Sequence, residues 1–540
     1  MPDLNVGPGY IKMMKKSIGI VLIAVLHMTL YGQNSHYKGK VVDARYKTPV
    51  PYAVVFVEHT QIGTVANNVG EFSFSVPDSL KNSRLASVGE GYRLTYLVPE
   101  GYDHIALPIA LEPQEQVAES PVGGGAVKPG KFGSLLNKAA RFVMNDWIPL
   151  GDPETNTFDF GRIQTFPTYN SIEGVRLRAG LASNARLSPH FFVKGYAAYG
   201  FRDQQLKYRG EAIWSFDRKA YHDEEFPKNN LRLVYEKDLY SPGEMHPRAL
   251  NDLLLITYRR SLNEATYRNF AEINYEREYP NGLAHTLWLR KSRLVPEGAL
   301  QFEERRGDMI LSAQELNTAE MGLQLRYSVR EAYVQQKRKR RPIEMTSPVF
   351  FLSHTIGQYD YFGEEKPWHR SEFSAQKRFL LGEAGRLDAV GEVMRIWNAV
   401  PFPLLVYPNQ RQRHHIENNA FFLNRALELM ADEQVTLRTT FVGDDLLLSK
   451  IALLDRLGVK ELLSLRASYG RLSDKNDPEK SSELYRFPPV SYRYGSAPYL
   501  EGTIGFTNIL GLLRVEYVHR FTYRDHPDAL LGKIRVDVTL

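Results

Sequence analysis

The sequence predicts an all-β chain in which a small N-terminal β-sandwich precedes a transmembrane antiparallel β-barrel of roughly 16 strands, within a range of roughly 12 to 18. Short apolar runs between residues 36 and 112 are separated by proline and glycine, which is typical of small β-domains. From residue 169 onward, apolar and charged side chains alternate with a period of two. The mean hydropathy of -0.36 excludes a bundle of membrane-spanning helices, which needs several apolar runs of about 20 residues.

The composition narrows the function classes. The chain has 540 residues, 43% of them hydrophobic and 12% aromatic, which is enough to build folded domains. It has no cysteine, so disulfides, thiol catalysis and a lipid-bearing cysteine are excluded. Its 68 basic and 62 acidic residues nearly balance along the chain. Because the N-terminal segment predicts export, we do not expect nucleic acid as a partner. The basic cluster QQKRKRR at 335–341 is interpreted as a solvated loop, with contact to anionic lipid headgroups as the alternative.

Residues 1–32 have the pattern of an upstream segment followed by a secretory signal peptide. Lys15 and Lys16 precede an apolar core over 18–30, and the small residue Gly32 follows. A core of about 13 residues is shorter than the roughly 20 that span a bilayer, so a cleaved signal is favoured over an uncleaved anchor. We therefore expect export, with residues 1–12 lying before the true start of the protein.

Residues 36–112 are expected to form the sandwich, with strands around Val41, 54–57 and Phe72 and no room for a catalytic apparatus. The segment resembles the carboxypeptidase regulatory-like domain, a transthyretin-like sandwich found at the periplasmic end of many outer-membrane proteins. This resemblance implies an accessory module and no peptidase activity. The matching residues are Gly39, Val41 and Asp43, the stretches PVPYAVVFV and GTVANNVGEFSF, and Leu85, Ser87, Gly91 and Tyr92.

Residues 113–168 are predicted to be a linker with a short helix. The density of proline and glycine in EPQEQVAESPVGGGAVKPGKFG indicates a flexible connector. Within it, GAVKPGKF nearly matches a phosphate-binding loop. However, Phe132 replaces the required Ser or Thr and no strand precedes the loop, so no nucleotide site is expected. The apolar spacing of 134–152 predicts an amphipathic helix that packs on the barrel or partly plugs it.

Residues 169–540 are assigned to the barrel. In LLRVEYVHRFTYRD, Val515 and Tyr517 share one parity while Arg514 and Glu516 share the other. A soluble sandwich also alternates, but it seldom fills one parity of every strand with apolar and aromatic residues. Hydrocarbon outside and a polar lumen inside produce this pattern, and the backbone can be satisfied in lipid only if the sheet closes. His519 lies on the apolar parity, so we expect it at the membrane interface or at a bulge.

The same alternation predicts strands in several further stretches. These stretches are EGVRLRAGL, LKYRGEAIWSF, NLRLVYE, MGLQLRYSV, KELLSLRASYG and KIRVDVTL. The stretch 446–463 has a partial helical face, although a strand end, a short helix or turn around 453–458 and a new strand from Val459 fit its context better. Aromatic residues near the strand ends are expected to form two interfacial girdles.

No catalytic, cofactor-binding or metal-binding residue is predicted, and we expect no cofactor and no enzyme activity. His414 and His415 are adjacent, but neighbours in a strand point to opposite faces and do not readily share a metal. No H-E-x-x-H, EF-hand or G-x-S-x-G motif occurs. A hydrolase site built from distant strands is the least favoured alternative, since sequence spacing does not expose such a site.

The C-terminal region resembles the barrel of an outer-membrane protein family of unknown function that is commonly paired with the regulatory-like domain. The resemblance implies a barrel over most of 140–540. The chain departs from the family in having no long middle region between sandwich and barrel, and in ending at Leu540 rather than at an aromatic residue. The stretches that carry the resemblance are YNSIEGVRLRAG, VKGYAAYGFRDQQLKY, FVGDDLLLSKIALLDRLGVKELLSLRASYGRLSDKND and NILGLLRVEYVHRFTY.

Together these features predict a protein of the Gram-negative outer membrane whose N-terminal domain lies in the periplasm. The first functional expectation is solute binding or transport through a polar lumen, and the alternative is a scaffold that docks a partner through the sandwich. Expected partners are outer-membrane lipid and lipopolysaccharide, the barrel-assembly machinery, and a periplasmic or surface protein. A TonB-dependent transporter is disfavoured because the chain has no space for a plug domain and 22 strands.

Overall fold

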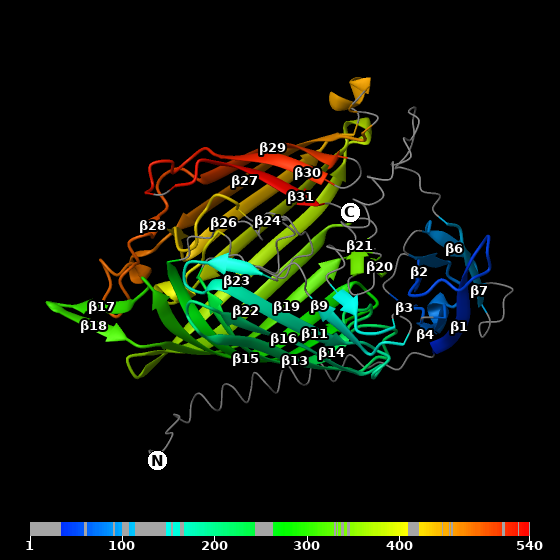
Figure 1. The fold of residues 1–540 in the computed structure, drawn as a ribbon, viewed down its shortest axis with the longest axis horizontal. Helices are drawn as coiled ribbons and strands as arrows, with labels where there is room; N and C mark the ends of the chain where they lie inside the picture. Colours follow the sequence, from blue (N-terminus) through cyan, green and yellow to red (C-terminus); the bar gives the residue numbers. More distant parts are fainter. Residues whose placement is uncertain are drawn as a thin grey trace, which may run out of the picture.

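The architecture is seen in a computed structural model of the chain. Two β-sheet bodies lie side by side along the long axis of the molecule, a small one formed by the first seven strands of the sequence and a large one that contains most of the remaining strands (Figure 1). The structure describes residues 34–58, 62–67, 69–89, 92–99, 107–113, 147–152, 155–161, 167–242, 263–328, 331, 333–335, 340–342, 346–408, 421–444, 446–452, 454, 457–509, 513–527 and 529–538. The segment 1–32 with the predicted signal peptide, the sequence GAVKPGKF and the two adjacent histidines lie outside these residues.

The small body is the predicted sandwich. A three-stranded sheet in the order β4-β1-β7 faces a four-stranded sheet in the order β3-β2-β5-β6, and β1 runs parallel to β7 but antiparallel to β4. Its elements are β1 (Asn34–Asp43), β2 (Val54–Val57), β3 (Gly63–Val65), β4 (Glu71–Pro77), the 3-10 helix η1 (Asp78–Leu80), β5 (Leu85–Val88), β6 (Thr95–Leu97) and β7 (Leu107–Leu111).

Strand β2 is buried on both of its faces, which explains why its sequence is an unbroken apolar run. Val55 and Val57 point into the core between the two sheets, beside Tyr37 of β1. Val54 and Phe56 point the other way, into a second apolar cluster against which Ala220 of the large body packs. A strand covered on one face only would show the alternation that is seen elsewhere in this chain.

Asp43 and Tyr92, two of the residues on which the predicted resemblance rests, meet in the sandwich. The Oδ1 atom of Asp43 accepts hydrogen bonds from the backbone N–H groups of Arg45 at 2.7 Å and Tyr46 at 2.8 Å, which fixes the turn after β1. The hydroxyl of Tyr92 donates to the other carboxylate oxygen at 3.0 Å. These donors, first of all the N–H of Tyr46, hold the pKa of Asp43 below its usual value.

The sandwich contacts the large body through the connection at 216–228. Ala220 packs against the cluster around Val54 and Phe56, and the ring of Tyr221 meets that of Tyr52 edge-on, with 5.3 Å between centroids. The connection is fixed from within by Glu225, whose carboxylate accepts the backbone N–H groups at 220–222. Burial raises the pKa of Glu225.

The large body is a single sheet of 18 strands that closes into a barrel. From β11 to β31, each strand pairs antiparallel with the next strand in the sheet. Strand β31 neighbours β8, β8 pairs with β9, and β9 pairs with β11, so the order returns to its start. Strand β10 pairs only with β11, so the closed ring has 17 of the 18 strands of the sheet. The predicted antiparallel barrel is confirmed, and its strand number lies within the predicted range.

Every stretch in which alternation predicted a strand lies in this sheet. The strands are β8 (Trp147–Pro149), β9 (Phe158–Gly161), β10 (Thr168–Asn170), β11 (Gly174–Ser183), β12 (Phe191–Gly200), β13 (Leu206–Ser215), β14 (Asn229–Tyr240), β15 (Glu264–Glu278), β16 (Leu283–Gly298), β19 (Leu316–Ser328), β22 (Val349–Tyr361), β23 (Glu364–Leu380), β24 (Arg386–Ile396), β26 (Glu433–Val442), β27 (Lys460–Arg471), β29 (Tyr499–Ile509), β30 (Leu513–Arg520) and β31 (Gly532–Val538).

The predicted barrel boundary at residue 169 is wrong. Strands β8 and β9 belong to the barrel sheet but lie within the segment 113–168 that was expected to be a linker. They are three and four residues long, so their sequences are too short to show a period of two. Strand β8 also replaces the last part of the helix expected over 134–152, and residues 134–146 lie outside the described residues.

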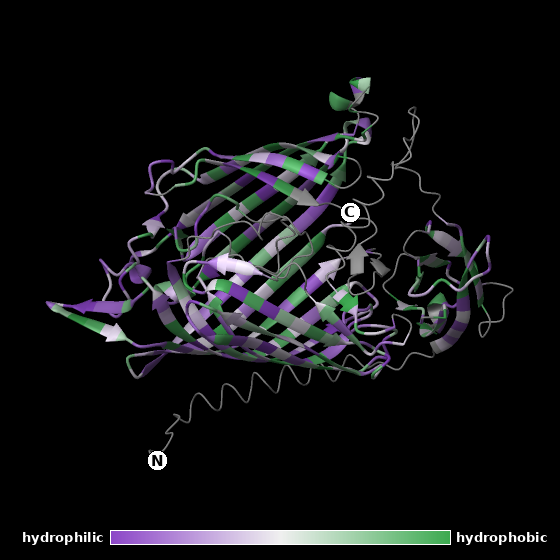
Figure 2. Ribbon diagram, in the orientation of Figure 1, coloured by the Kyte–Doolittle hydropathy of each residue, from purple (hydrophilic) through white to green (hydrophobic). Residues whose placement is uncertain are grey.

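The barrel is apolar on the outside and polar on the inside, the reverse of a water-soluble fold. Green and purple positions alternate along the strands in Figure 2. On β29 the outward side chain of Ile504 is 60% exposed, whereas the inward side chain of Glu501 is fully buried. The charged parity of β30 behaves in the same way, because Arg514, Glu516 and Arg520 are all buried. This burial pattern fits a hydrocarbon environment around the barrel.

Exposed aromatic side chains gather toward both ends of the strands, as the girdle prediction required. At the end next to the sandwich they include Phe191, Trp214, Phe216, Tyr327, Phe350 and Phe379, and at the opposite end they include Tyr199, Phe201, Trp397, Tyr469 and Phe521. His519 lies on the outer face between Tyr517 and Phe521, with ring centroids 6.1 and 5.1 Å away. Its strand is regular there, so the interface interpretation is favoured and the bulge alternative is wrong.

The two ends of the barrel differ in their connections. At the end next to the sandwich, 279–282 and 381–385 are short turns, whereas the connections 216–228 and 443–459 are longer. At the far end, 362–363 is a tight turn, the connections 299–315 and 472–498 are long, and a hairpin projects from the first of these two (Figure 1). The remaining elements are β17 (Phe302–Arg306), β18 (Met309–Ala313), β20 (Tyr333–Gln335), β21 (Arg340–Pro342), β25 (Leu429–Met430), β28 (Tyr492–Arg493) and the 3-10 helices η5 (Gly382–Ala384), η6 (Phe402–Leu404), η7 (Leu448–Lys450) and η8 (Asp474–Asn476).

Candidate functional site in the barrel lumen

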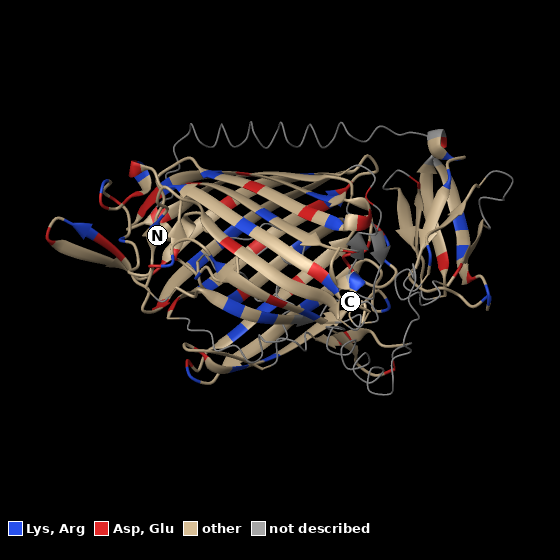
Figure 3. Cartoon of the chain, turned by 90° about the horizontal axis from the view of Figure 1, so that it is seen from above, with Lys and Arg blue, Asp and Glu red and all other residues tan. Residues whose placement is uncertain are grey.

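Charged side chains on neighbouring strands line the lumen side of β11 to β16. Arg176 and Asp238 form two parallel hydrogen bonds of 2.8 and 2.9 Å between β11 and β14. Glu236 receives Arg209 from one side and Arg268 from the other, each at 2.7 Å. Lys, Arg, Asp and Glu are seen along many barrel strands in Figure 3. Because these charges are paired across strands, this part of the wall is polar but largely neutralised.

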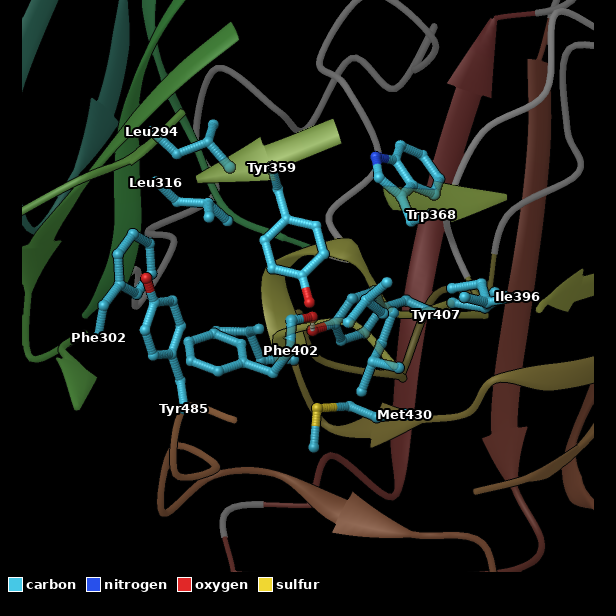
Figure 4. Packing of buried hydrophobic residues seen from close by; sticks show 14 of the residues in the cluster. Leu294, Phe302, Leu316, Tyr359, Trp368, Ile396, Phe402, Tyr407, Met430 and Tyr485 are labelled. Atoms are coloured by element: carbon cyan, nitrogen blue, oxygen red, sulfur yellow. Dashed lines mark hydrogen bonds between the residues drawn. The ribbon is translucent and has the colours of Figure 1, made fainter. Parts of the chain in front are cut away.

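The connection between β24 and β26 packs inside the far end of the barrel. Residues 402–407 of this connection join inward side chains of the wall in one buried apolar cluster (Figure 4). Tyr485, from the connection 472–498, stacks on Phe302 of the hairpin, with 5.2 Å between ring centroids. The wall contributes Leu294, Leu316, Tyr359, Trp368, Met394 and Ile396 to this cluster. We call the described parts of the connection, 397–408 and 421–432, the inner loop.

Polar contacts fasten the second half of the inner loop to the barrel wall. Nη2 of Arg520 donates to Glu428 at 2.5 Å, and the ring of His526 lies 2.9 Å from the same oxygen. The carboxylate of Glu501 accepts the backbone N–H groups of 422–424 at 2.8 to 3.1 Å, together with the hydroxyl of Tyr499 at 2.6 Å. Buried carboxylates with several donors of this kind fix a segment strongly, because removing the acceptor leaves the donors unsatisfied.

Three arginines from neighbouring strands gather under the inner loop. Arg514 donates to Glu516 through Nε at 2.8 Å and Nη2 at 2.5 Å, and Arg535 pairs with the same carboxylate from β31. The ring of Phe422 lies 3.5 Å from the guanidinium carbon of Arg535 and 4.5 Å from that of Arg466. The carboxylate of Glu516 therefore pairs with an arginine of its own strand and with one of the neighbouring strand.

The side chains of the lumen limit the chemistry of this site. Within the described residues, no group of three or more His, Asp or Glu is placed to hold a metal ion. The described part of the chain has no helix that is both long enough and apolar enough to cross a membrane. The described wall can contact a bound solute through paired charged side chains and through aromatic rings.

The sequence indicated some of these residues and missed others. The alternation in β30 and β31 assigns Arg514, Glu516 and Arg535 to the polar side from the order of the residues alone. Glu428 and Phe422 were missed, because the inner loop has no period that assigns a face to its side chains. The density of apolar residues in PFPLLVY, unusual for a connection, is the signal that could have identified a packed loop.

Residues 152–392 match the model of a family described as "Family of unknown function (DUF5686) C-terminal domain". The match agrees with the predicted resemblance to a barrel family of unknown function, and it ends before the motifs at 441–477 and 508–523. No curated protein matches the chain. The resemblance of 36–112 to the carboxypeptidase regulatory-like domain stays a prediction.

Several solved outer-membrane proteins have a similar strand arrangement. BamA from Haemophilus ducreyi lacking POTRA domains 1-3 is 9% identical with a TM-score of 0.42, and the alignment covers 75% of this chain and 78% of that one. CdiB from Acinetobacter baumannii is 9% identical with a TM-score of 0.36 and coverages of 69% and 58%. OccK10 (OpdN) from Pseudomonas aeruginosa is 10% identical with a TM-score of 0.29 and coverages of 68% and 93%. Likeness at this level says nothing about what this chain does.

Proposed function

We propose that the chain is an outer-membrane β-barrel protein that binds a charged solute in its lumen and passes it across the membrane. The observation that carries the proposal is the inverted burial of the closed sheet. An apolar outer face requires lipid, and a buried wall of arginine and carboxylate side chains suits a charged or strongly polar guest. A protein whose only task was to anchor the sandwich would have no need of such a wall.

The sandwich is proposed to lie in the periplasm. Outer-membrane barrels have short turns on the periplasmic side and long loops on the outside. The short turns at 279–282 and 381–385 are at the sandwich end, and the long connections 299–315 and 472–498 are at the far end. The long connection 443–459 at the sandwich end and the tight turn 362–363 at the far end depart from this pattern. The apolar belt would then contact outer-membrane lipid and lipopolysaccharide, and insertion would depend on the barrel-assembly machinery.

The inner loop argues for a gated or binding lumen over a wide, permanently open one. Its first half fills the far end with an apolar cluster, and its second half is fastened to the wall through Glu428 and Glu501. Passage therefore requires the loop to move. The alternative of a docking scaffold receives less support, because the apolar outer face of β2 and β5 already packs in part against Ala220 of the barrel connection.

The test is the conductance of the purified, folded full-length protein in planar lipid bilayers. The wild type is expected to give small or rare current steps, since the inner loop occupies the far end. Glu428→Gln removes the charge that pairs with Arg520 and His526, so the loop should detach more often and the steps should become larger or more frequent. Heat-dependent migration on gels establishes that both proteins are folded.

Glu433→Gln serves as the matched control. Glu433 makes an exposed ion pair with Arg395 at 3.2 Å at the start of β26, and exposed pairs of this kind contribute little. The same change of charge at this position should leave the currents unchanged. Folded wild-type and Glu428→Gln barrels that both stay electrically silent would contradict passage through the lumen.

A further inference from the structure

One lumen arginine has an unused hydrogen-bonding edge. Arg466 of β27 is 1% exposed, and its Nη1 donates to the hydroxyl of Thr503 at 2.8 Å. Its Nε and Nη2 have no hydrogen-bond partner among the described residues. A guanidinium stays protonated at all physiological pH values, so this side chain does not escape the cost of burial by losing its charge. The two unpaired N–H donors lie on the same edge of the guanidinium group, so an acceptor placed at that edge would offset the cost of burying them.

The unused edge is the one that binds carboxylates elsewhere in this barrel. Arg378 donates through Nε and Nη2 to both oxygens of Asp388, at 2.6 and 2.8 Å. Arg514, close to Arg466, uses the same two nitrogens on Glu516. This planar edge matches the two oxygens of a carboxylate or of a phosphate group.

The carboxylates nearest to Arg466 are already engaged. Glu516 receives Arg514 and Arg535, and Glu501 receives the backbone N–H groups of the inner loop and the hydroxyl of Tyr499. Neither carboxylate makes a hydrogen bond to Arg466. The local balance of three arginines and two carboxylates therefore leaves one positive charge, and that charge sits on the arginine whose edge is unused.

We propose that Arg466 binds an oxyanion group of a solute, a carboxylate or a phosphate, in the lumen beneath the inner loop. The inference rests on the proposed function and specifies its solute as anionic. The oxyanion accepts from Nε and Nη2 of Arg466, in the position that a carboxylate takes on Arg378. Phe422, whose ring lies against the guanidinium groups of Arg466 and Arg535, connects the site to the loop that must move.

The test measures the urea midpoint of unfolding of the full-length protein in lipid vesicles, followed by tryptophan fluorescence. Sodium phosphate and sodium succinate are each compared with sodium chloride at equal ionic strength. A ligand that binds only the folded state raises the midpoint in proportion to the logarithm of its concentration. We expect a rise with at least one of the two oxyanions, and which one it is distinguishes a phosphate from a carboxylate guest.

Three variants identify the residue responsible. Arg466→Met should abolish the rise while leaving the chloride midpoint as high as or higher than that of the wild type, because it removes an uncompensated buried charge. Arg466→Lys keeps the charge without the planar edge and should weaken the rise. Arg471→Met, an exposed position on the same strand, makes the same substitution away from the cluster and should leave the rise intact.

The outcomes separate this inference from the proposed function. No midpoint rise with either oxyanion, or an equal rise in Arg466→Met, would overturn the anion site. A large loss of stability in Arg466→Met measured in chloride would also overturn it, because Arg466 would then be a satisfied structural residue. The measurement needs no current, so an electrically silent barrel with an oxyanion-dependent midpoint would refute passage and keep the site.

Discussion

Replacing an outward leucine at mid-strand by arginine tests whether lipid surrounds the barrel. Leu465 is 47% exposed on β27, and its side chain lies on the outer face with Leu437 and Leu463. In water, a substitution at a half-exposed position of this kind usually changes stability by less than about 0.5 kcal/mol. In a bilayer the same side chain would face hydrocarbon, so the two environments predict different magnitudes.

The position of Leu465 within its strand sets the expected cost. It is the sixth residue of a strand that spans Lys460–Arg471. With a rise of about 3.3 Å per residue and a tilt of about 40°, it lies about 13 Å along the membrane normal from the start of the strand. That depth is the middle of an apolar band about 25 Å tall, where an arginine costs about 2–4 kcal/mol. The folding equilibrium constant should fall by a factor of roughly 30 to 1,000.

Reversible urea unfolding from phospholipid vesicles measures this cost directly. Leu447→Arg is the matched control, because Leu447 is 70% exposed in the connection between β26 and β27, beyond the ends of both strands. It should change the free energy of unfolding by less than about 0.5 kcal/mol. Equal, small effects of the two substitutions would refute the argument that the outer face touches lipid.

Two further predictions concern the sandwich. Tyr52→Ala removes the ring that packs on Tyr221, so protease should cleave the sandwich from the barrel more readily. The heat-dependent gel migration of the barrel should not change. An unaltered digestion pattern would show that the contact does not hold the two bodies together. The pKa of Asp43 is lowered in the folded state by the N–H of Tyr46, so its contribution to stability is present above about pH 4 and is lost as the pH falls through the folded pKa. Asp43→Asn should therefore weaken the resistance of the sandwich to protease at neutral pH and flatten its loss in acid; an acid profile identical to that of the wild type would contradict this role.

Much of the barrel could be predicted because one physical rule acts on each residue separately. A side chain that faces lipid must be apolar and its neighbour in the strand faces the lumen, so the parity of Val515 and Arg514 is visible in the sequence itself. The sandwich departs from this rule at β2, where the two parities contact different apolar partners. At β2 the sequence therefore shows a continuous run of apolar residues instead of an alternation of apolar and polar residues.

The inner loop could not be predicted, because its contacts join residues far apart in the chain. Glu428 meets Arg520, and Glu501 meets the backbone at 422–424, yet nothing in the local sequence links these partners. The same is true of the edge of Arg466, which is unusual only because Glu501 and Glu516 are occupied elsewhere. Such a site depends on which donors and acceptors near Arg466 are already paired, and only a structure shows this.

The side chains of the lumen wall differ between one part of the barrel and another, and this difference explains where the inner loop packs. Ion pairs dominate the inner face of β11 to β16, whereas the far ends of β22 to β24 carry Tyr359, Trp368 and Ile396 inward. A barrel that only held water would not need aromatic residues there, since they are costly against an aqueous lumen. They are stable because the inner loop covers them, and the same loop lays Phe422 over the arginines deeper in the lumen. Moving the loop away from an anion at Arg466 would therefore expose the apolar cluster, and this coupling favours a lumen that opens only transiently.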